Sequence, residues 1–430
     1  MHTNDGLLFL SPGFPGSSLS GVRILGLAAD GYACGNYRVN YPLQVAAFQG
    51  ASVRIRNVSI CPVTMEEVLE ADVIYCQRFT DPNLCKMFSD VQKAKGTKLI
   101  YDLDDALTCV PPSSPAFSDY NASTKVGQGH LKGIEGFLEA ADTVIFSTRE
   151  LQAVYSKYRH KSYIVPNGLD LKLSTRNWES GKTTWHAEAK KQGFTPSDDT
   201  LLVGVAGGKT HFHDWKLLAD SLERITKEST AFIGIQADPE VVSELLDGYW
   251  KNVRDRVIVF KPETYENYPA TLAKFDINLA PLQNNRFNLG KSPLRLLELG
   301  AWGVPYVASD VAPFHRFHKE SGGLCGELAQ GNDFASPALA LIHNKDLMTR
   351  KSAAIKEFVR TKCDAFETAK SVPLIIRATL LGVRTLSDIS ISDARLGIPD
   401  IKFPLKSQSL CPCGTSKLYG QCCAPAFGRL

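Results

Sequence analysis

Apolar segments with the length of buried strands alternate with helical segments along most of this 430-residue chain. Alternation of this kind predicts parallel sheets covered by helices on both faces. A chain of this length exceeds one ordinary domain, so we expect an α/β protein with two doubly wound, Rossmann-like domains. The expected strands are Val22–Leu27, Ser52–Arg56, Val73–Cys76, Lys98–Tyr101, Thr143–Phe146, the apolar segment before Gly207, Ala231–Ile235, Arg256–Phe260, Phe275–Ala280 and Tyr306–Ala308.

The stretch NLGKSPLRLLELGAWGVPYVASD, residues 288–310, carries the clearest binding pattern. Ser292 is a good N-cap and Pro293 a good first helical residue, so a helix should begin there. Its free N–H groups would point back toward Gly290 and Lys291. A helix N-terminus beside a lysine and a glycine favours a bound phosphate, so these residues predict a phosphate cradle.

Glu298 lies farther along the same predicted helix. It should sit about 7 Å along the axis from Pro293, at ~1.5 Å per residue, which is a plausible distance from a bound phosphate to the hydroxyls of an attached ribose. The alternative is a buried glutamate paired with Arg295 in an ordinary α/β helix. The candidate nucleotide contacts of this stretch are Gly290, Lys291, Ser292 and Glu298.

A second glycine turn follows the apolar segment LLVGVA and is rich in cations. If the sheet is doubly wound, this turn and Lys291 meet at one edge and would clamp one pyrophosphate. Lys209 and Lys216 are among the cations of this turn. A metal pair of His211 and His213 would lack a third ligand, which disfavours it. The candidate contacts are Gly207, Gly208, Lys209 and His211.

The loop AADGYACGNYR, residues 28–38, follows the first predicted strand. A glycine-containing turn between a strand and a helix is a common place for a ligand, because N–H groups and the helix dipole converge there. Gly31, Gly35 and Arg38 are therefore candidate ligand contacts. A tight turn with a surface arginine is the alternative.

Three acids, Asp102, Asp104 and Asp105, stand at the carboxyl end of another predicted strand. Acids this close need solvent, hydrogen bonds or a positive ligand. We predict that Asp104 or Asp105 contacts an acceptor or orients the loop, with Asp105 as the catalytic candidate. A helix N-cap cluster is one alternative. The other takes Asp102 and Asp104 as a D-x-D metal motif.

The residues around Glu298 resemble the nucleotide-sugar site of GT-B glycosyltransferases, especially glycosyltransferase family 4. That family places two glutamates eight apart before G-x-P-x-V-A-S-D; Glu298 matches the second, which holds the ribose, whereas Gly290 occupies the place of the first. The segment SYIVPNGLDL resembles the family's hinge at Pro166, Asn167 and Gly168. Residues 28–38 resemble the first glycine-rich loop of these enzymes.

The resemblance implies a GT-B architecture, with two Rossmann-like domains facing a cleft. It also implies transfer of a sugar from a nucleotide diphosphate sugar with retention of configuration and no catalytic metal. The family's second glycine turn supplies basic phosphate ligands, which implies this role for Lys209, with Lys216 as an alternative. Lys209 and Lys291 would then be catalytic by stabilising the leaving diphosphate. The acceptor would be a saccharide, a protein or nucleic acid. The alternatives are a non-catalytic nucleotide-sugar or glycan-binding module and a glycosyltransferase that acts on modified nucleic-acid bases.

The C-terminus reads SLCPCGTSKLYGQCCAP, and its paired cysteines suit one tetrahedral Zn²⁺. It resembles the SEC-C motif, a structural or partner-docking zinc knuckle found at the end of the SecA translocase and on many unrelated proteins. The cysteines that match its ligands are Cys411, Cys413, Cys422 and Cys423.

Composition and segment boundaries complete the prediction. The formal net charge of +3 argues against a dedicated non-specific nucleic-acid binder. The chain shows no run of 18 apolar residues and no signal peptide, and its cysteine pattern suits a reducing compartment, so we expect a soluble, cytoplasmic protein. The expected segments are a flexible arm 1–20, an acceptor-side domain 21–170, a linker or insertion 171–198, a nucleotide-sugar-binding domain 199–384, a linker 385–408 and a zinc knuckle 409–425.

Overall fold

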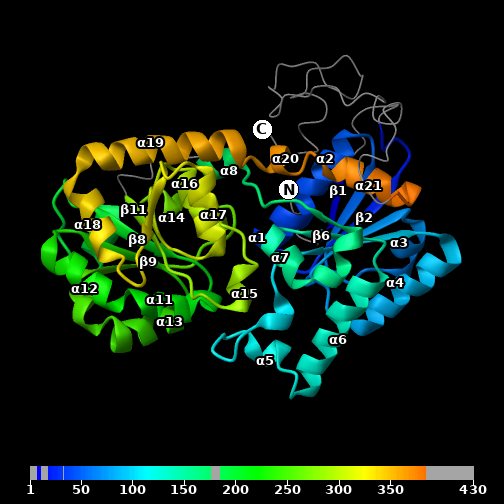
Figure 1. Cartoon of the computed structure of the whole chain (residues 1–430), viewed down its shortest axis with the longest axis horizontal. Helices are drawn as coiled ribbons and strands as arrows, with labels where there is room; N and C mark the ends of the chain where they lie inside the picture. The colour runs from blue at the N-terminus through cyan, green and yellow to red at the C-terminus, as the bar shows by residue number, and fades with distance from the viewer. Residues whose placement is uncertain (1–6, 11–17, 32, 176–184, 384–430) are drawn as a thin grey trace, which may run out of the picture. The chain divides into compact units, whose positions relative to one another are not determined.

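The computed structural model describes residues 7–10, 18–31, 33–175 and 185–383 (Figure 1). The chain forms two compact units. The first contains the residues up to Thr108, Asp119–Gly168 and the chain from Ala365 onward, and the second contains Cys109–Ser118 and Leu169–Asp364. Within the described ranges, no helix combines the length and apolar character that a membrane crossing requires.

The first unit is built on a seven-stranded sheet in the order β1-β3-β2-β4-β5-β6-β7. All pairs are parallel except β1 with β3. The strands from β2 to β6 lie where the sequence predicts them, to within one or two residues, because their short apolar or alternating segments favour strands. The strands are β1 (Leu7–Leu10), β2 (Arg23–Ala28), β3 (Ser52–Asn57), β4 (Val73–Gln77), β5 (Lys98–Leu103), β6 (Thr143–Phe146) and β7 (Ser162–Ile164).

Strand β1 is a correction to the expected flexible arm. Leu7–Leu10 pairs with β3 in an antiparallel register that joins Leu7 to Arg56. Leu8 is buried in the core of the unit, together with Leu19. The short apolar segment therefore gains backbone hydrogen bonds and burial at the sheet edge, which the surrounding Pro and Gly residues concealed in the sequence.

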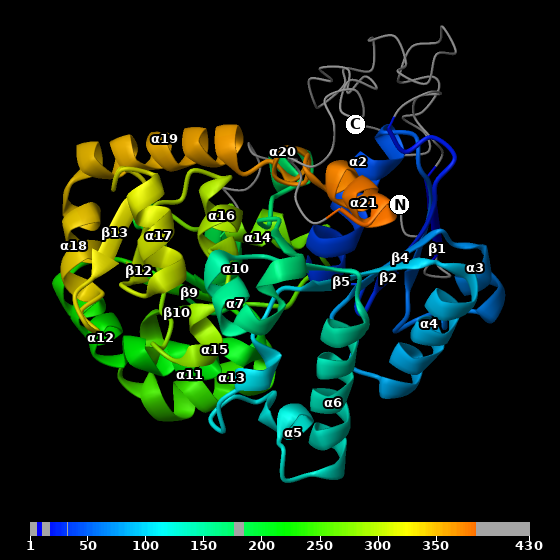
Figure 2. The ribbon, with the colours of Figure 1, turned by 45° about the vertical axis from the view of Figure 1, so that its right-hand side comes forward.

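Helices cover the first sheet, and α4 and α6 pack together, as Figures 1 and 2 show. Good caps fix several ends: Thr64 and Glu67 form a capping box at α3, and Gly96 ends α4 in the left-handed conformation. The helices are α1 (Ala33–Gly35), the π-helix η1 (Asn36–Asn40), α2 (Tyr41–Phe48), α3 (Met65–Glu70), α4 (Pro82–Lys95), α6 (Lys125–Ala140), α7 (Arg149–Val154), α20 (Ala365–Thr368) and α21 (Val372–Leu381). Two short helices adjoin the segment that belongs to the second unit, η2 (Leu107–Cys109) and α5 (Phe117–Tyr120).

The second unit contains a six-stranded, all-parallel sheet in the order β10-β9-β8-β11-β12-β13. In chain order this is 3-2-1-4-5-6, the arrangement of a Rossmann domain, whose direction of winding reverses between its first and fourth strands. The strands are β8 (Leu202–Ala206), β9 (Phe232–Gln236), β10 (Val257–Phe260), β11 (Ile277–Ala280), β12 (Tyr306–Ser309) and β13 (Gly326–Ala329), of which β13 was not expected.

Helices surround this sheet, and α19 packs along α16 and α18 (Figure 1). They are α8 (Leu171–Thr175), α10 (Trp185–Lys191), the 3-10 helix η4 (Lys209–His211), α11 (Phe212–Trp215), α12 (Ala219–Glu228), α13 (Pro239–Glu244), α14 (Tyr268–Leu272), α15 (Arg286–Leu289), α16 (Leu294–Gly300), α17 (Ala312–Glu320), α18 (Ala335–His343) and α19 (Lys345–Lys362). Further short turns are η3 (Ser156–Lys161) in the first unit and η5 (Lys216–Leu218), η6 (Leu245–Tyr249) and η7 (Lys251–Arg256) in the second.

The segment 171–198 is a second correction, because part of it belongs to the core rather than to a linker. Trp185 and Ala189, four residues apart on α10, are buried against β8, β9 and β10 through Leu202, Phe232 and Ile258. One face of a short helix is enough to bury a tryptophan. The segment was not recognised as helical because it is too polar to show a clear helical periodicity of apolar residues.

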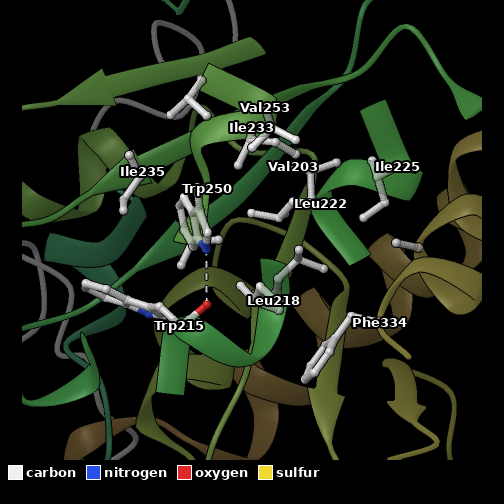
Figure 3. Close-up of a cluster of buried hydrophobic side chains, with 14 of the residues drawn as sticks. Val203, Trp215, Leu218, Leu222, Ile225, Ile233, Ile235, Trp250, Val253 and Phe334 are labelled. Carbon is white, nitrogen blue, oxygen red and sulfur yellow. Dashed lines mark hydrogen bonds between the residues drawn. The ribbon is translucent and has the colours of Figure 1, made fainter. Parts of the chain in front are cut away.

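A cluster of buried side chains holds α11 to the second sheet (Figure 3). Trp215 and Trp250 are almost completely buried, and the indole N–H of Trp250 donates to the backbone oxygen of Trp215 at 3.3 Å. Val203 and Ile233 from the sheet and Leu222 from α12 belong to the same cluster. Trp215 thus anchors the short helix that carries the polar residues described below.

Candidate functional site

The second sheet reverses its direction of winding between β8 and β11, which are paired through Val203 and Ile277. Ligands of open α/β sheets bind beside the carboxyl ends of the strands at such a point. Strand β8 ends at Ala206 and leads into the Gly207–Gly208 turn, and β11 ends at Ala280 and leads toward α15. The fold therefore brings the two predicted binding segments to one edge.

Gly207 has a backbone conformation that requires glycine, with φ at +148°. A Cβ atom there would stand 3.2 Å from Cδ2 of His211 and 3.5 Å from Cζ2 of Trp215. A Cβ on Gly208 would meet no atom within 4 Å. The missing side chain of Gly207 thus makes room for the His211 ring, whereas the space beside Gly208 is not filled by other described atoms.

His211 and Asp214 form a dyad across the start of α11. The Nδ1 atom of His211 lies 2.8 Å from Oδ2 of Asp214, and the side chains are 15% and 5% exposed. The other carboxylate oxygen, Oδ1, accepts a hydrogen bond from the backbone N–H of Gln283 at 2.8 Å and from Nδ2 of Asn288 at 3.5 Å. Donors from two segments therefore hold the carboxylate.

The charge states of the dyad follow from its surroundings. His211, Arg295 and the Gln283 N–H hold the pKa of Asp214 below its ordinary value although burial opposes them, so the carboxylate is ionised. Burial and the positive charges of Arg295 and Lys291 lower the pKa of His211 to about 3, against the attraction of Asp214. The imidazole is therefore neutral near pH 7.

Helix α16 begins one residue later than expected. Pro293 is its N-cap, with φ and ψ of −78° and 26°, and its oxygen accepts from the N–H of Leu296 at 2.8 Å, so the chain is not yet α-helical at the proline. Ser292 is therefore not the capping residue. Gly290 is buried and Lys291 is half-buried, with its Nζ atom 4.4 Å from the centre of the Phe287 ring.

Arg295 links α16 to the dyad. Its guanidinium is buried and donates from Nη1 to the backbone oxygen of Pro281 at 3.2 Å. Burial lowers its pKa against the attraction of Asp214, Tyr268 and Glu298. Glu298 is half-buried and lies one turn farther along α16. Burial of Tyr268 and the negative charge of Glu298 both raise the pKa of Tyr268. Arg295 is therefore attracted electrostatically by both Asp214 and Glu298, and Glu298 is not its sole carboxylate neighbour.

In the first unit, Arg38 lies in an interior network. Its Nε and Nη2 atoms donate to both carboxylate oxygens of Asp102 at 2.8 and 2.9 Å, and neither side chain is exposed. Its Nη1 atom donates to the oxygen of Val165 at 2.6 Å and to Oδ1 of Asn167 at 2.8 Å. Arg38 is therefore not a surface arginine, and its donors are used within the unit.

Gly35 lies nearby at the end of α1, where a Cβ would meet the backbone oxygen of Asp30 at 2.1 Å. Its N–H donates to Oδ1 of Asp30 at 3.2 Å. Gly35 thus permits a close approach of the chain to itself, which explains the glycine without a ligand.

Asp104 and Asp105 face Arg78, which follows β4. Arg78 donates to both oxygens of Asp104 at 2.9 and 2.7 Å and approaches Oδ2 of Asp105 at 3.4 Å. Asp102 is held by Arg38 and by the hydroxyl of Tyr75 at 2.7 Å. The D-x-D interpretation is disfavoured, because both of its carboxylates are engaged by arginines.

The predicted site residues thus divide between the two units. Gly207, Gly208, His211, Lys291 and Glu298 belong to the second unit, and Gly35, Arg38 and Asp105 to the first. Lys209 lies in η4, but its side chain is outside the part of the chain that the structure describes. The four predicted zinc ligands, Cys411, Cys413, Cys422 and Cys423, also lie outside it, and the described residues contain no cluster of metal ligands.

Asp214, Gln283 and Arg295 were not predicted as parts of the candidate site, although Arg295 was expected as an alternative partner of Glu298. The signal for Asp214 is its position three residues after His211, which places both on one side of a helical turn. Gln283 acts through its backbone N–H, which residue types do not reveal.

Comparisons with known proteins place this geometry in context. No protein-family model and no curated protein matches the chain. Among solved structures, Anabaena HepE in complex with UDP and glucose gives a TM-score of 0.59 at 13% identity, covering 83% of this chain and 100% of HepE. Sucrose-phosphate synthase of Thermosynechococcus elongatus gives 0.58 at 13%, covering 84% and 99%. WaaG, a glycosyltransferase involved in lipopolysaccharide biosynthesis, gives 0.55 at 11%, covering 84% and 100%. At this level of identity the likeness shows the fold, so the chain has the GT-B fold, with two Rossmann-like units.

Proposed function

We propose that this protein is a glycosyltransferase that uses a nucleotide diphosphate sugar as donor. The observation that carries the proposal is that the Gly207 turn follows β8 and that Lys291 and Glu298 follow β11, the two strands at the switch point of a Rossmann sheet in one unit. The GT-B fold supports it, since HepE has the same fold and was solved with UDP and glucose and with UDP-glucose.

In the proposed reaction, the bond between the anomeric carbon of the sugar and the diphosphate oxygen breaks, and a bond to an acceptor oxygen forms. The acceptor proton passes to the departing diphosphate, and configuration is retained. Lys291 and Lys209 stabilise the charge that develops on the diphosphate, which is the usual large electrostatic contribution to such a transfer. Glu298 accepts hydrogen bonds from the ribose hydroxyls.

The first unit contributes to the acceptor side in this proposal. Asp105 is the candidate there, because its side chain is 20% exposed, compared with 7% for Asp104, and its distance to Arg78 is the longer one. Arg38 is not part of the proposed ligand contacts, since Asp102, Val165 and Asn167 use its donors.

A binding screen tests the proposal. Calorimetry of the purified chain against UDP-, GDP-, ADP- and TDP-glucose should show selective binding to one nucleotide, weakened by Glu298→Ala and by Lys291→Ala. Release of free glucose or transfer to added acceptors then measures turnover. Absence of binding to all four donors would contradict the proposal.

A non-catalytic nucleotide-sugar-binding module is the second candidate, favoured by one observation. Gly290, which is buried, occupies the position that corresponds to the first glutamate of the resembling family, so that contact to the donor sugar is missing. Binding of a donor without transfer and without hydrolysis, even after long incubation, would favour this module over an enzyme.

A further inference from the structure

The tautomer of His211 is fixed by its partner. The Asp214 carboxylate is ionised and can only accept hydrogen bonds, so the Nδ1 atom 2.8 Å away must carry the proton. The Nε2 atom of the neutral ring then presents a lone pair. Among the described residues, Nε2 has no hydrogen-bond partner, and the side chain remains partly exposed.

This tautomer determines which ligand groups can form a hydrogen bond with Nε2 of His211. Phosphate oxygens are acceptors and cannot bond to a lone pair, so the neutral ring does not belong to a phosphate clamp. Protonation of the ring is opposed by burial and by Lys291 and Arg295 from the α16 segment, and only Asp214 favours it. The partner of Nε2 must therefore be a hydrogen-bond donor.

The neighbours of His211 indicate where that donor lies along the ligand. Gln283 and Asn288, which hold Asp214, precede Lys291 in the chain, whereas Glu298 follows Lys291 on α16. In the proposed function Glu298 contacts the ribose and Lys291 the diphosphate. The group beyond the diphosphate is the transferred sugar, and sugars offer hydroxyl donors.

We propose that His211 is a specificity-determining residue that accepts, at Nε2, a hydrogen bond from a hydroxyl group of the transferred sugar. Asp214 positions the ring for this contact, and Gly207 makes room for it. The inference rests on the proposed function. His211 orients the sugar rather than acting as a general base, because its protonated form is strongly disfavoured.

Two variants of His211 separate the ring atoms. In His211→Asn the amide can still donate to Asp214 from near the Nδ1 position, but nothing replaces Nε2. In His211→Gln the longer side chain can place an acceptor oxygen near the Nε2 position. His213→Asn, a substitution two residues away, is the matched control.

Calorimetry of the full chain compares UDP, GDP, ADP and TDP with their glucose esters. His211→Asn should weaken binding of the glucose ester of the preferred nucleotide about three- to tenfold and leave the nucleotide alone within about twofold. His211→Gln should recover part of the loss, and His213→Asn should match the wild type.

Other outcomes overturn the inference. An equal loss for the nucleotide and its ester would place His211 on the ribose or the diphosphate, and an unchanged ester affinity would leave it a structural role. Binding of no nucleotide ester by the wild type would overturn the proposed function as well. Long-range ¹H–¹⁵N spectra give an independent check, since a protonated Nε2 in the ligand-free protein at pH 7 would contradict the inference while leaving the proposed function untouched.

Discussion

Arg38 and Asp102 form a two-bonded ion pair, and neither side chain has any solvent exposure. Burial raises the pKa of Asp102 even though Arg38 and the Tyr75 hydroxyl stabilise its charged form. The cost of burying the charges is therefore comparable to their attraction, as is common for interior ion pairs. The intact pair therefore adds little net free energy to the stability of the fold, whereas loss of one partner would leave an uncompensated buried charge and destabilise it strongly.

Asp102→Ala should lower the free energy of unfolding of the first unit by about 3–5 kcal/mol, because it leaves a buried guanidinium without its counter-charge. The double variant Arg38→Met/Asp102→Ala should cost less than the sum of its single variants. Urea titration followed by circular dichroism measures both. Lys86→Ala, which removes an exposed ion pair with Asp90, is the control and should leave the midpoint unchanged. Additive losses in the double variant would show that the pair is not coupled.

The Gly207 turn gives a second prediction. Gly207→Ala should destabilise the second unit by about 1–3 kcal/mol, because alanine resists a φ of +148° and its Cβ would press on the His211 ring. Donor affinity should fall with it. Gly208→Ala, where a Cβ meets no atom within 4 Å, should leave the stability unchanged. Thermal unfolding of the two variants checks this, and equal melting temperatures would contradict the role of Gly207.

The sequence predicted the elements of this fold better than the contacts between them. Continuous apolar runs such as Val73–Cys76 favour buried strands, and β6 has the bounds expected from its sequence. The start of α16 was missed by one residue, because Ser292 is the favoured N-cap by residue type, whereas Pro293 occupies that position in the structure. Only the backbone dihedrals distinguish the two positions.

The sequence indicated a glycine turn and nearby cations as a candidate site, but not the pairings between side chains. Arg38 and Asp102 are 64 residues apart, and nothing local marks them as partners. His211 was expected among cationic contacts because the sequence does not show burial, which decides its charge state. Residue types locate a site, whereas burial and long-range partners decide what each residue does in it.

Glu298 and Lys291 should affect different steps. Glu298→Ala should raise the donor KM about three- to tenfold with little change in kcat, because ribose contacts are alike in the ground and transition states. Lys291→Ala should lower kcat as well, about 10²-fold, since negative charge on the leaving diphosphate develops during the reaction. Initial rates over a range of donor concentrations measure both. Lys362→Ala on the exposed end of α19 is the control, and unchanged kinetics in both site variants would contradict the assignment.

The last prediction concerns acid stability. The pKa of His211 is about 3 in the folded protein and about 6.5 in the unfolded chain. Between these values the unfolded state binds a proton that the folded state does not, so stability is lost as the pH falls through this window and is unaffected above it. His211 alone should reduce the free energy of unfolding by about 1.5 kcal/mol between pH 6.5 and pH 5. Urea midpoints at the two pH values should therefore differ less for His211→Asn than for the wild type. His343→Asn changes an exposed histidine of the same unit and should follow the wild type. An identical pH dependence in all three proteins would show that His211 titrates normally, and it would remove the physical basis for a neutral, sugar-facing ring.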